Sequence, residues 1–131
     1  MLHDFLPVEL TSCHQTNQIE YIVNKLRSQP TSRRAVAITW EPWKDCEGNE
    51  SVPCLQELQF WMVQGKMNVE FSMRSNDILL ALPQNIVGFT NLQMYIARQL
   101  GVRIGKYYMR IRIPHIYDIR DANYLKPWLG E

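Results

Sequence analysis

Residues 58–73 of the chain read LQFWMVQGKMNVEFSM, and this stretch decides the fold. Apolar side chains occupy every second position on both sides of Gln64-Gly65, a pair typical of a tight turn. This period of two predicts two antiparallel strands with one buried face. The positions expected on that face are Leu58, Phe60, Met62, Met67, Val69, Phe71 and Met73.

The residues before this hairpin predict a helix, a strand and a loop. A helix is indicated between Asn17 and Pro30, because apolar residues recur at the i, i+3, i+4, i+7 spacing of one helical face. Residues 35–40 are short, apolar and rich in β-formers, which favours a buried strand. Residues 41–53 contain two prolines, a glycine and an asparagine, and they therefore predict a loop. Cys54 stands where this loop re-enters the hairpin.

The residues after the hairpin predict more helix and strand. Residues 74–77 are expected to leave the second hairpin strand. Residues 86–100 are mostly apolar and are followed by the helix-ending Gly101, which indicates a long buried central helix. Residues 107–113 alternate again and predict a strand, and residues 118–128 predict a short terminal helix.

These elements predict an α+β fold in which a mixed β-sheet packs against helices. The 131 residues are enough for one domain with its own core. We expect an N-terminal arm at 1–16, a core at 17–117 that carries the motifs, and a C-terminal segment at 118–131. The apolar face of the hairpin is expected to need cover from a second copy of the chain.

Composition excludes several classes of function. The net charge is +1, so no overall field favours binding to nucleic acid or to a membrane surface. No apolar run reaches the roughly 18 residues of a spanning helix, and the N-terminus lacks a secretion signal. Three cysteines without a regular framework favour a reducing compartment, so the expected location is the cytoplasm.

Cys54 is the candidate nucleophile. A thiol at a loop-to-strand junction can meet solvent, and nearby cations favour the reactive thiolate. The alternative is a small buried hydrophobe, the common role of a free cysteine. A zinc site with Cys46, or with Cys13 and His14, lacks a typical ligand spacing, and a Cys46–Cys54 disulfide does not fit a reducing compartment. We therefore expect no metal.

Polar residues around Cys54 suggest an anionic, base-bearing substrate. Arg33, Arg34 and Arg74 offer bidentate contacts to phosphate, although a solvated corner also explains the Arg33-Arg34 pair. The amide of Asn85 donates and accepts at once, as reading the O4/N3 edge of uracil requires, but a helix N-cap is the alternative. His115 and Tyr117 lie on one face of a strand, where both reach a ribose hydroxyl unless the histidine is structural.

Taken in order, these motifs resemble the thymidylate synthase family in its shorter, archaeal-like form. The resemblance runs from about Asn17 to Tyr117 and covers most of the chain. The matching motifs are Ser-Arg-Arg at 32–34, Pro-Cys at 53–54, a glutamine five residues after the cysteine, Arg-Ser-x-Asp at 74–77, Pro-x-Asn-Ile at 83–86 and His-x-Tyr at 115–117.

The resemblance implies a reaction and a role for each residue. The chain would methylate dUMP with 5,10-methylenetetrahydrofolate, and Cys54 would attack C6 of the pyrimidine. Members of the family form homodimers, and in such a dimer Arg33 and Arg34 would reach the partner's site. The other implied roles are phosphate binding by Arg74 and Ser75, uracil selection by Asn85, binding of the 3′-hydroxyl by His115 and Tyr117, a folate contact from Asp77 and support of the nucleotide site by Gln59.

The chain also departs from the family pattern. It lacks the family's usual N-terminal phosphate loop and relay glutamate, and its C-terminal folate-closing tail is absent or replaced by residues 123–131. Gln84, Leu55 and Ile113 stand where the family commonly has Phe, His and Asp. The chain is therefore expected to be a fragment of a longer synthase or a naturally short relative. A non-catalytic dUMP-binding relative and a pyrimidine hydroxymethylase remain alternatives.

Overall fold

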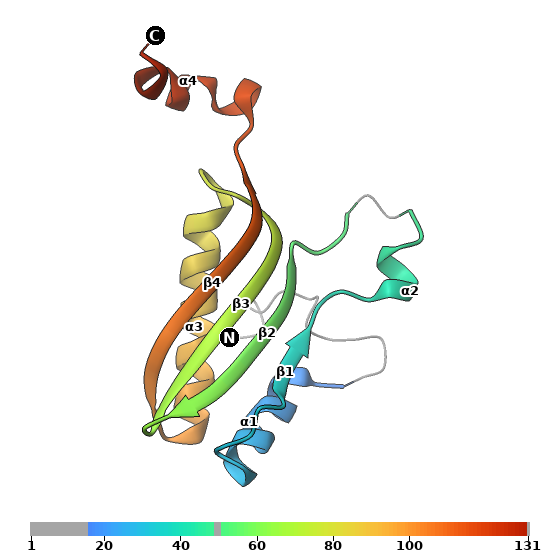
Figure 1. Ribbon diagram of the computed structural model, residues 1–131, viewed down its shortest axis with the longest axis vertical. Coiled ribbons are helices and arrows are strands. Elements are labelled where there is room, and N and C mark those ends of the chain that lie inside the picture. Colours follow the sequence, from blue (N-terminus) through green and yellow to red (C-terminus); the bar gives the residue numbers. More distant parts are fainter. Residues whose placement is uncertain (1–15, 49–50, 131) are drawn as a thin grey trace.

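A computed structural model describes residues 16–48 and 51–130 of the chain (Figure 1). Most of the predicted N-terminal arm, and with it Cys13 and His14, therefore lies outside the described residues. The elements along the chain are α1 (Gln18–Ser28), β1 (Ala35–Ile38), α2 (Pro42–Asp45), β2 (Leu55–Val63), β3 (Lys66–Asp77), α3 (Ala81–Leu100), β4 (Arg103–His115) and α4 (Asp118–Leu129).

The four strands form one mixed sheet in the order β1-β2-β3-β4. β1 pairs with β2 and β2 with β3 in antiparallel fashion, whereas β4 runs parallel to β3 after a crossover through α3. The predicted turn is present, because Gln64 and Gly65 join β2 to β3 with φ angles of 50° and 69°. The predicted α+β class is confirmed.

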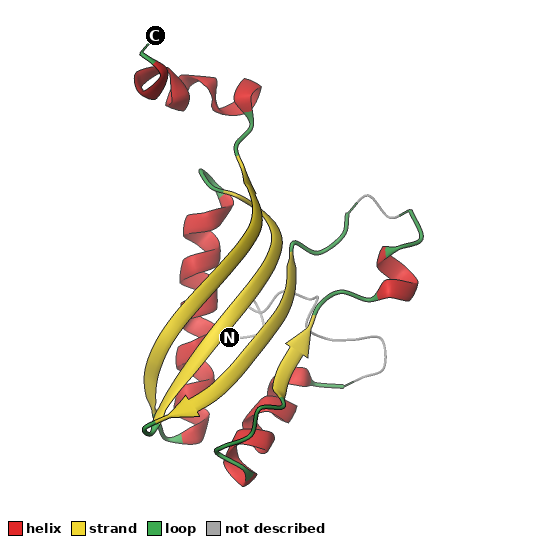
Figure 2. Cartoon of the chain, viewed as in Figure 1, coloured by secondary structure: helices red, strands yellow, loops and turns green. Residues whose placement is uncertain are grey.

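One face of the sheet is covered by the chain's own helices, α1 and α3 (Figure 2). Phe71 of β3 lies at the centre of this core, where its ring stacks on Phe89 with centroids 4.4 Å apart and meets Phe60 edge-on at 6.3 Å. The expectation that this apolar face needs a second copy was wrong. Met67, Val69, Phe71 and Met73 are at most 2 % exposed within the single chain.

The opposite face is left open by the described helices. It carries the alternate residues of β2, β3 and β4, where Trp61 stacks on Tyr108 with ring centroids 5.9 Å apart. Arg110 forms an ion pair with Glu70 on the same face at 3.1 Å. Any partner chain that covers the sheet would therefore meet an aromatic and charged surface, not the aliphatic face predicted from the sequence.

The start of α1 and both ends of α3 follow from local sequence. Asn17 caps α1, because its side-chain oxygen accepts the backbone N–H of Glu20 at 3.1 Å. α3 ends at Gly101, whose φ of 68° is left-handed. It begins at Ala81, five residues before the predicted start, because the first helical turn tolerates Pro83. α3 is buried along one face only, since Val87 on the other side is 62 % exposed.

Three shorter segments differ from expectation. The loop at 41–53 contains the four-residue helix α2, which begins with Pro42. β3 continues through residues 74–77, which were expected to leave the strand. The buried alternation of β4 stops before Ile113, which is 67 % exposed. Of the helices described, none is long and apolar enough to cross a membrane.

Candidate functional site

A cavity of about 590 Å³ lies at the end of the sheet where β2 begins and where β3 and β4 end. The first turns of α3 and the start of α4 complete its wall. Seven of the residues predicted from the sequence line this one cavity: Cys54, Arg74, Ser75, Asp77, Asn85, His115 and Tyr117.

Cys54 is exposed and directly precedes β2, as the loop-to-strand pattern predicted. Arg74 of β3 fixes this segment. Its backbone N–H donates to the carbonyl of Cys54 at 2.8 Å, and its guanidinium donates to the carbonyls of Pro53 and Val52, both at 2.9 Å. The thiol therefore shares its cavity with a permanent cation that also shapes its loop.

His115 and Ser75 are held side by side by the pairing of β3 with β4. Asp77 lies opposite His115 in the register, and the backbone N–H of Ile78 donates to the His115 carbonyl at 3.0 Å. The Ser75 hydroxyl and the His115 Nδ1 are 3.2 Å apart, and the roles of donor and acceptor depend on the histidine tautomer. The Tyr117 ring packs edge-on against His115 at 5.1 Å. Together they form a hydroxyl-rich wall.

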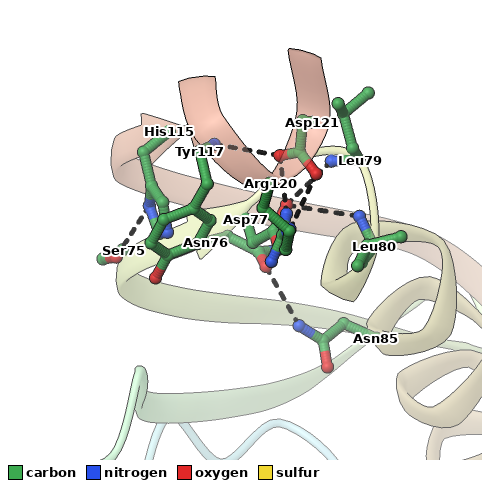
Figure 3. Close-up of polar contacts among 10 residues, drawn as sticks. All are labelled: Ser75, Asn76, Asp77, Leu79, Leu80, Asn85, His115, Tyr117, Arg120 and Asp121. Carbon is green, nitrogen blue, oxygen red and sulfur yellow. Dashed lines mark hydrogen bonds and ion pairs between the residues drawn. The ribbon is translucent and has the colours of Figure 1, made fainter. Parts of the chain in front are cut away.

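Asn85 lies inside α3, so the N-cap alternative does not apply. Its Nδ2 donates to the Oδ1 of Asn76 at 3.2 Å (Figure 3). Asn76 is only 2 % exposed, and its own Nδ2 donates to the Sδ of Met73 at 3.6 Å. The amide predicted to read a base is thus anchored to a buried second amide.

Asp77 is engaged on both carboxylate oxygens. Its Oδ1 accepts the backbone N–H groups of Leu79 and Leu80 at 3.0 and 3.2 Å, and its Oδ2 lies 2.7 Å from Arg120. Burial acts to raise the pKa of Asp77, but the hydrogen bonds from Arg120, Leu80 and Leu79 outweigh it and hold the pKa below its ordinary value. A carboxylate offers about four acceptor positions, so one is left for a ligand donor.

Arg120 ties the start of α4 to the cavity. It donates to Asp121 through Nε and Nη2 at 2.7 and 2.6 Å, and its guanidinium lies 4.5 Å from the centre of the Tyr117 ring (Figure 3). These hydrogen bonds lower the pKa of Asp121, a buried residue that also accepts the Tyr117 backbone N–H at 2.9 Å. One cation thus bridges two carboxylates at the edge of the cavity.

Three predicted site residues do not line the cavity. Arg33 and Arg34 are exposed residues just before β1, on the far side of the sheet order from β4. Gln59 donates to the carbonyl of Arg33 at 3.1 Å, and the Tyr21 hydroxyl donates to the carbonyl of Arg34 at 3.0 Å. These backbone contacts leave both guanidinium groups at the surface of the single chain.

Two residues at the site, Asn76 and Arg120, were not among those predicted from the sequence. Asn76 occupies the variable position of Arg-Ser-x-Asp, where a polar residue between two site residues was the available signal. Arg120 follows Tyr117 by three residues, in the Arg120-Asp121 pair of a helical first turn. Arg120 contacts Asp77 of β3, and Asn76 contacts Asn85 of α3; spacing along the sequence does not reveal such contacts between separate elements.

The zinc and disulfide alternatives gain no support from the described part of the chain. Within residues 16–48 and 51–130, no group of three or more His, Cys, Asp or Glu side chains lies where it would hold a metal ion. Cys46 and Cys54 are both free and exposed. The site therefore offers a thiol, an arginine, an amide and hydroxyl groups.

A sequence model of the thymidylate synthase family matches residues 6–126. A protein named "Putative thymidylate synthase" from Methanocaldococcus jannaschii is 46 % identical over 119 residues, which are 88 % of this chain and 54 % of that protein. The thymidylate synthase of Bacillus licheniformis is 36 % identical over 103 residues, 79 % of this chain and 37 % of that enzyme.

Solved structures point the same way. Thermostable thymidylate synthase A from Bacillus subtilis superposes with a TM-score of 0.76 at 31 % sequence identity, over 89 % of this chain and 41 % of that one. The chain thus spans about half the length, or less, of the relatives that it matches.

Proposed function

The chain belongs to the thymidylate synthase family, and from that premise we propose that it methylates dUMP to dTMP with 5,10-methylenetetrahydrofolate. The observation that carries the proposal is the meeting of seven predicted residues in one cavity of about 590 Å³. These residues come from separate segments, so their common location is a property of the fold. The expected setting is the cytoplasm.

The nucleotide would lie with its phosphate toward Arg74 and Ser75. Arg74 uses part of its guanidinium on the loop before Cys54 and retains further N–H donors for a phosphate oxygen. His115 and Tyr117 would bind the 3′-hydroxyl of the deoxyribose, and Asn85 would read the uracil edge. This order runs along the wall formed by the ends of β3 and β4 and the start of α3.

Cys54 would supply the covalent step. Its thiolate forms a bond to C6 of dUMP, and the electron pair of the C5–C6 double bond moves toward C5 and O4, which makes C5 a nucleophile. C5 would then bond to the one-carbon unit, whose bonds to the folate nitrogens break as it is transferred. Loss of the C5 proton and cleavage of the S–C6 bond return the thiolate. The folate supplies the one-carbon unit and the hydride that completes the methyl group.

Asp77 supports the folate side of the proposal. Its one remaining acceptor position suits an N–H donor of a pterin ring, while Arg120 and two backbone N–H groups keep the carboxylate ionised and fixed. An exposed acid in this place would be free to rotate, and this one is not.

The homodimer is part of the proposal, because three predicted residues lie away from the cavity of their own chain. Arg33 and Arg34 are exposed and supported by Gln59 and Tyr21, so their guanidinium groups are available to a phosphate held by a partner chain. Two copies placed back to back across the open sheet face would give each cavity further cations.

A second candidate is a dUMP-binding relative without turnover, because six of the seven predicted cavity residues are assigned to the nucleotide and only Asp77 to the folate. Such a relative needs the nucleotide pocket, but it needs neither the folate contact from Asp77 nor a residue that relays protons. A pyrimidine hydroxymethylase is a third candidate. It would use the same thiolate and leave a 5-hydroxymethyl product, which mass spectrometry distinguishes from the methyl product.

The test begins with calorimetric titration of the chain with dUMP, and with dCMP in parallel. We expect selective binding of dUMP, followed by dTMP formation when methylenetetrahydrofolate is added. Cys54→Ser should keep dUMP binding and abolish turnover, whereas Cys46→Ser, an exposed thiol outside the cavity, should change neither. Preference for dCMP, or binding of neither nucleotide, would contradict the proposal, and binding without turnover would favour the second candidate.

A further inference from the structure

The Asn85 amide is held in one orientation by a relay of three side chains. Its Nδ2 donates to Asn76 Oδ1 at 3.2 Å, and Asn76 Nδ2 donates to the Sδ of Met73 at 3.6 Å. A thioether sulfur accepts hydrogen bonds and has none to donate, so it fixes the direction of the whole relay. In Figure 3 the Oδ1 of Asn85 accordingly points away from Asn76.

A freely rotating amide does not distinguish the two pyrimidines. Uracil offers a donor at N3 and an acceptor at O4, and it pairs with an amide whose oxygen faces N3. Cytosine offers an acceptor at N3 and a donor at N4, and it pairs with the same amide after a half-turn. Asparagine at position 85 therefore selects a base only when something prevents that half-turn.

We propose that Asn76 is this restraint, a positioning residue that makes the site prefer uracil over cytosine. The inference rests on the proposed function, in which Asn85 reads the base. With Nδ2 tied to Asn76, Asn85 keeps Oδ1 and its second amide hydrogen for the ligand. That arrangement has the polarity that the uracil edge needs.

The burial of Asn76 makes the restraint strong. The residue is 2 % exposed, so turning Asn85 over would press its Oδ1 against Asn76 Oδ1 with no solvent to intervene. Turning both amides together would let Asn76 Nδ2 donate to Asn85 Oδ1, but it would set the buried Asn76 Oδ1 against the Met73 sulfur, which has no proton to donate. Unpaired polar atoms in a buried place are costly, and cytosine binding would incur that cost.

The test compares the ratio of the dissociation constants for dCMP and dUMP in three forms of the chain. The unaltered chain should strongly favour dUMP. Asn76→Leu removes the acceptor at similar size, and we expect the ratio to fall about tenfold or more. Asn76→Asp keeps an oxygen acceptor for Asn85 Nδ2 and should retain most of the preference. Asn76→Ala replaces the leucine variant if the larger side chain prevents folding.

The ratio separates positioning from general damage, because a destabilised pocket loses affinity for both nucleotides alike. A leucine or alanine variant that folds and keeps the original ratio overturns the inference and leaves the proposed function intact. An aspartate variant that folds and loses the preference as the leucine variant does also overturns it. Binding of neither nucleotide by the unaltered chain overturns the proposed function and this inference with it.

Discussion

Arg74 makes two side-chain hydrogen bonds to the carbonyls of Pro53 and Val52 and one backbone hydrogen bond to Cys54, so a single residue shapes the loop that presents the thiol. The planar guanidinium can do this while it keeps donors for a phosphate, because its N–H groups point in several fixed directions. Lysine carries the same charge on a single rotating ammonium. Replacing Arg74 by lysine therefore keeps the positive charge and removes the fixed arrangement of N–H donors.

We expect Arg74→Lys to lower the free energy of unfolding by about 1–3 kcal/mol, since at least one half-buried carbonyl loses its donor. It should also weaken dUMP binding. Chemical denaturation and calorimetry measure the two effects. Arg98→Lys is the matched control, because Arg98 is exposed in the last turn of α3, outside the cavity and away from the open sheet face, and it should change stability by less than about 1 kcal/mol. Equal effects of the two substitutions would contradict this account of Arg74.

Individual site residues could be predicted from the sequence where a motif marks the end of a strand. Arg74, Ser75 and Asp77 were predicted as a set and line one cavity, because neighbours at the end of a strand stay together in the fold. Asn76 was passed over, since its contact with Asn85 of α3 is set by tertiary packing. Gln59 was expected to support the nucleotide site, and in the single chain it instead contacts the backbone of Arg33.

Among the elements, α4 is attached to the cavity mainly through its first turn. Arg120 bridges Asp77 and Asp121 there, while Ile119 and Trp128 are 90 % and 88 % exposed. A helix held by so few side chains opens easily compared with the core. The part of the cavity wall that α4 forms should therefore depend on the Arg120 guanidinium.

Arg120→Gln should release α4 and leave the rest of the fold in place. Hydrogen exchange followed by mass spectrometry should show faster exchange in residues 118–129 and unchanged protection in α1. Lys126→Gln removes a positive charge from the same helix away from the cavity, and it should leave exchange unaltered. If the two variants exchange alike, the bridge from Arg120 does not hold the helix.

The same bridge predicts a dependence on pH. Both Asp77 and Asp121 have pKa values below the ordinary value of 3.8, so folding is favoured by their ionisation at any pH above about 4. That contribution is lost as the pH falls through their folded-state pKa values. NMR titration of the two carboxyl groups should show both pKa values moving up toward 3.8 in Arg120→Gln. Unchanged values would mean that another group depresses them.

The start of α3 shows why element boundaries were harder to predict than elements. The apolar run at residues 86–100, with Asn85 as a possible N-cap, suggested that the helix began at Ile86, yet it begins at Ala81. The first turn has N–H groups without partners inside the helix, so proline costs little there. This extension places Asn85 on a rigid helix beside the cavity, where a loop would have left it free.

For the whole molecule, the open face of the sheet is the feature to test. Trp61 and Tyr108 stack there beside Arg110 and Glu70, and the described helices cover only the other face. Aromatic and arginine side chains are enriched at protein interfaces. This face, and not the aliphatic one, is where we expect two copies to meet.

Trp61→Glu should convert the dimer to a monomer in analytical ultracentrifugation at micromolar concentration, because it places a charge at the centre of the interface. Trp128→Glu alters an equally large aromatic residue on α4 and should remain dimeric. Circular dichroism checks that both variants fold. A strictly monomeric unaltered chain would contradict the dimer and would also separate Arg33 and Arg34 from any phosphate in a partner's site.

The pairing of β3 with β4 also limits how this sequence can change over evolution. Asp77 faces His115, and Ser75 faces Ile113, in a parallel register that is continuous from Val69 and Tyr107 to the site and shifts by one residue near Met67. Within the continuous part, inserting or deleting one residue in either strand would move Ser75, Asp77 or His115 out of its pairing. Substitutions can accumulate gradually there, whereas changes in length are better tolerated on the other side of the register shift or in the connections, such as residues 41–53.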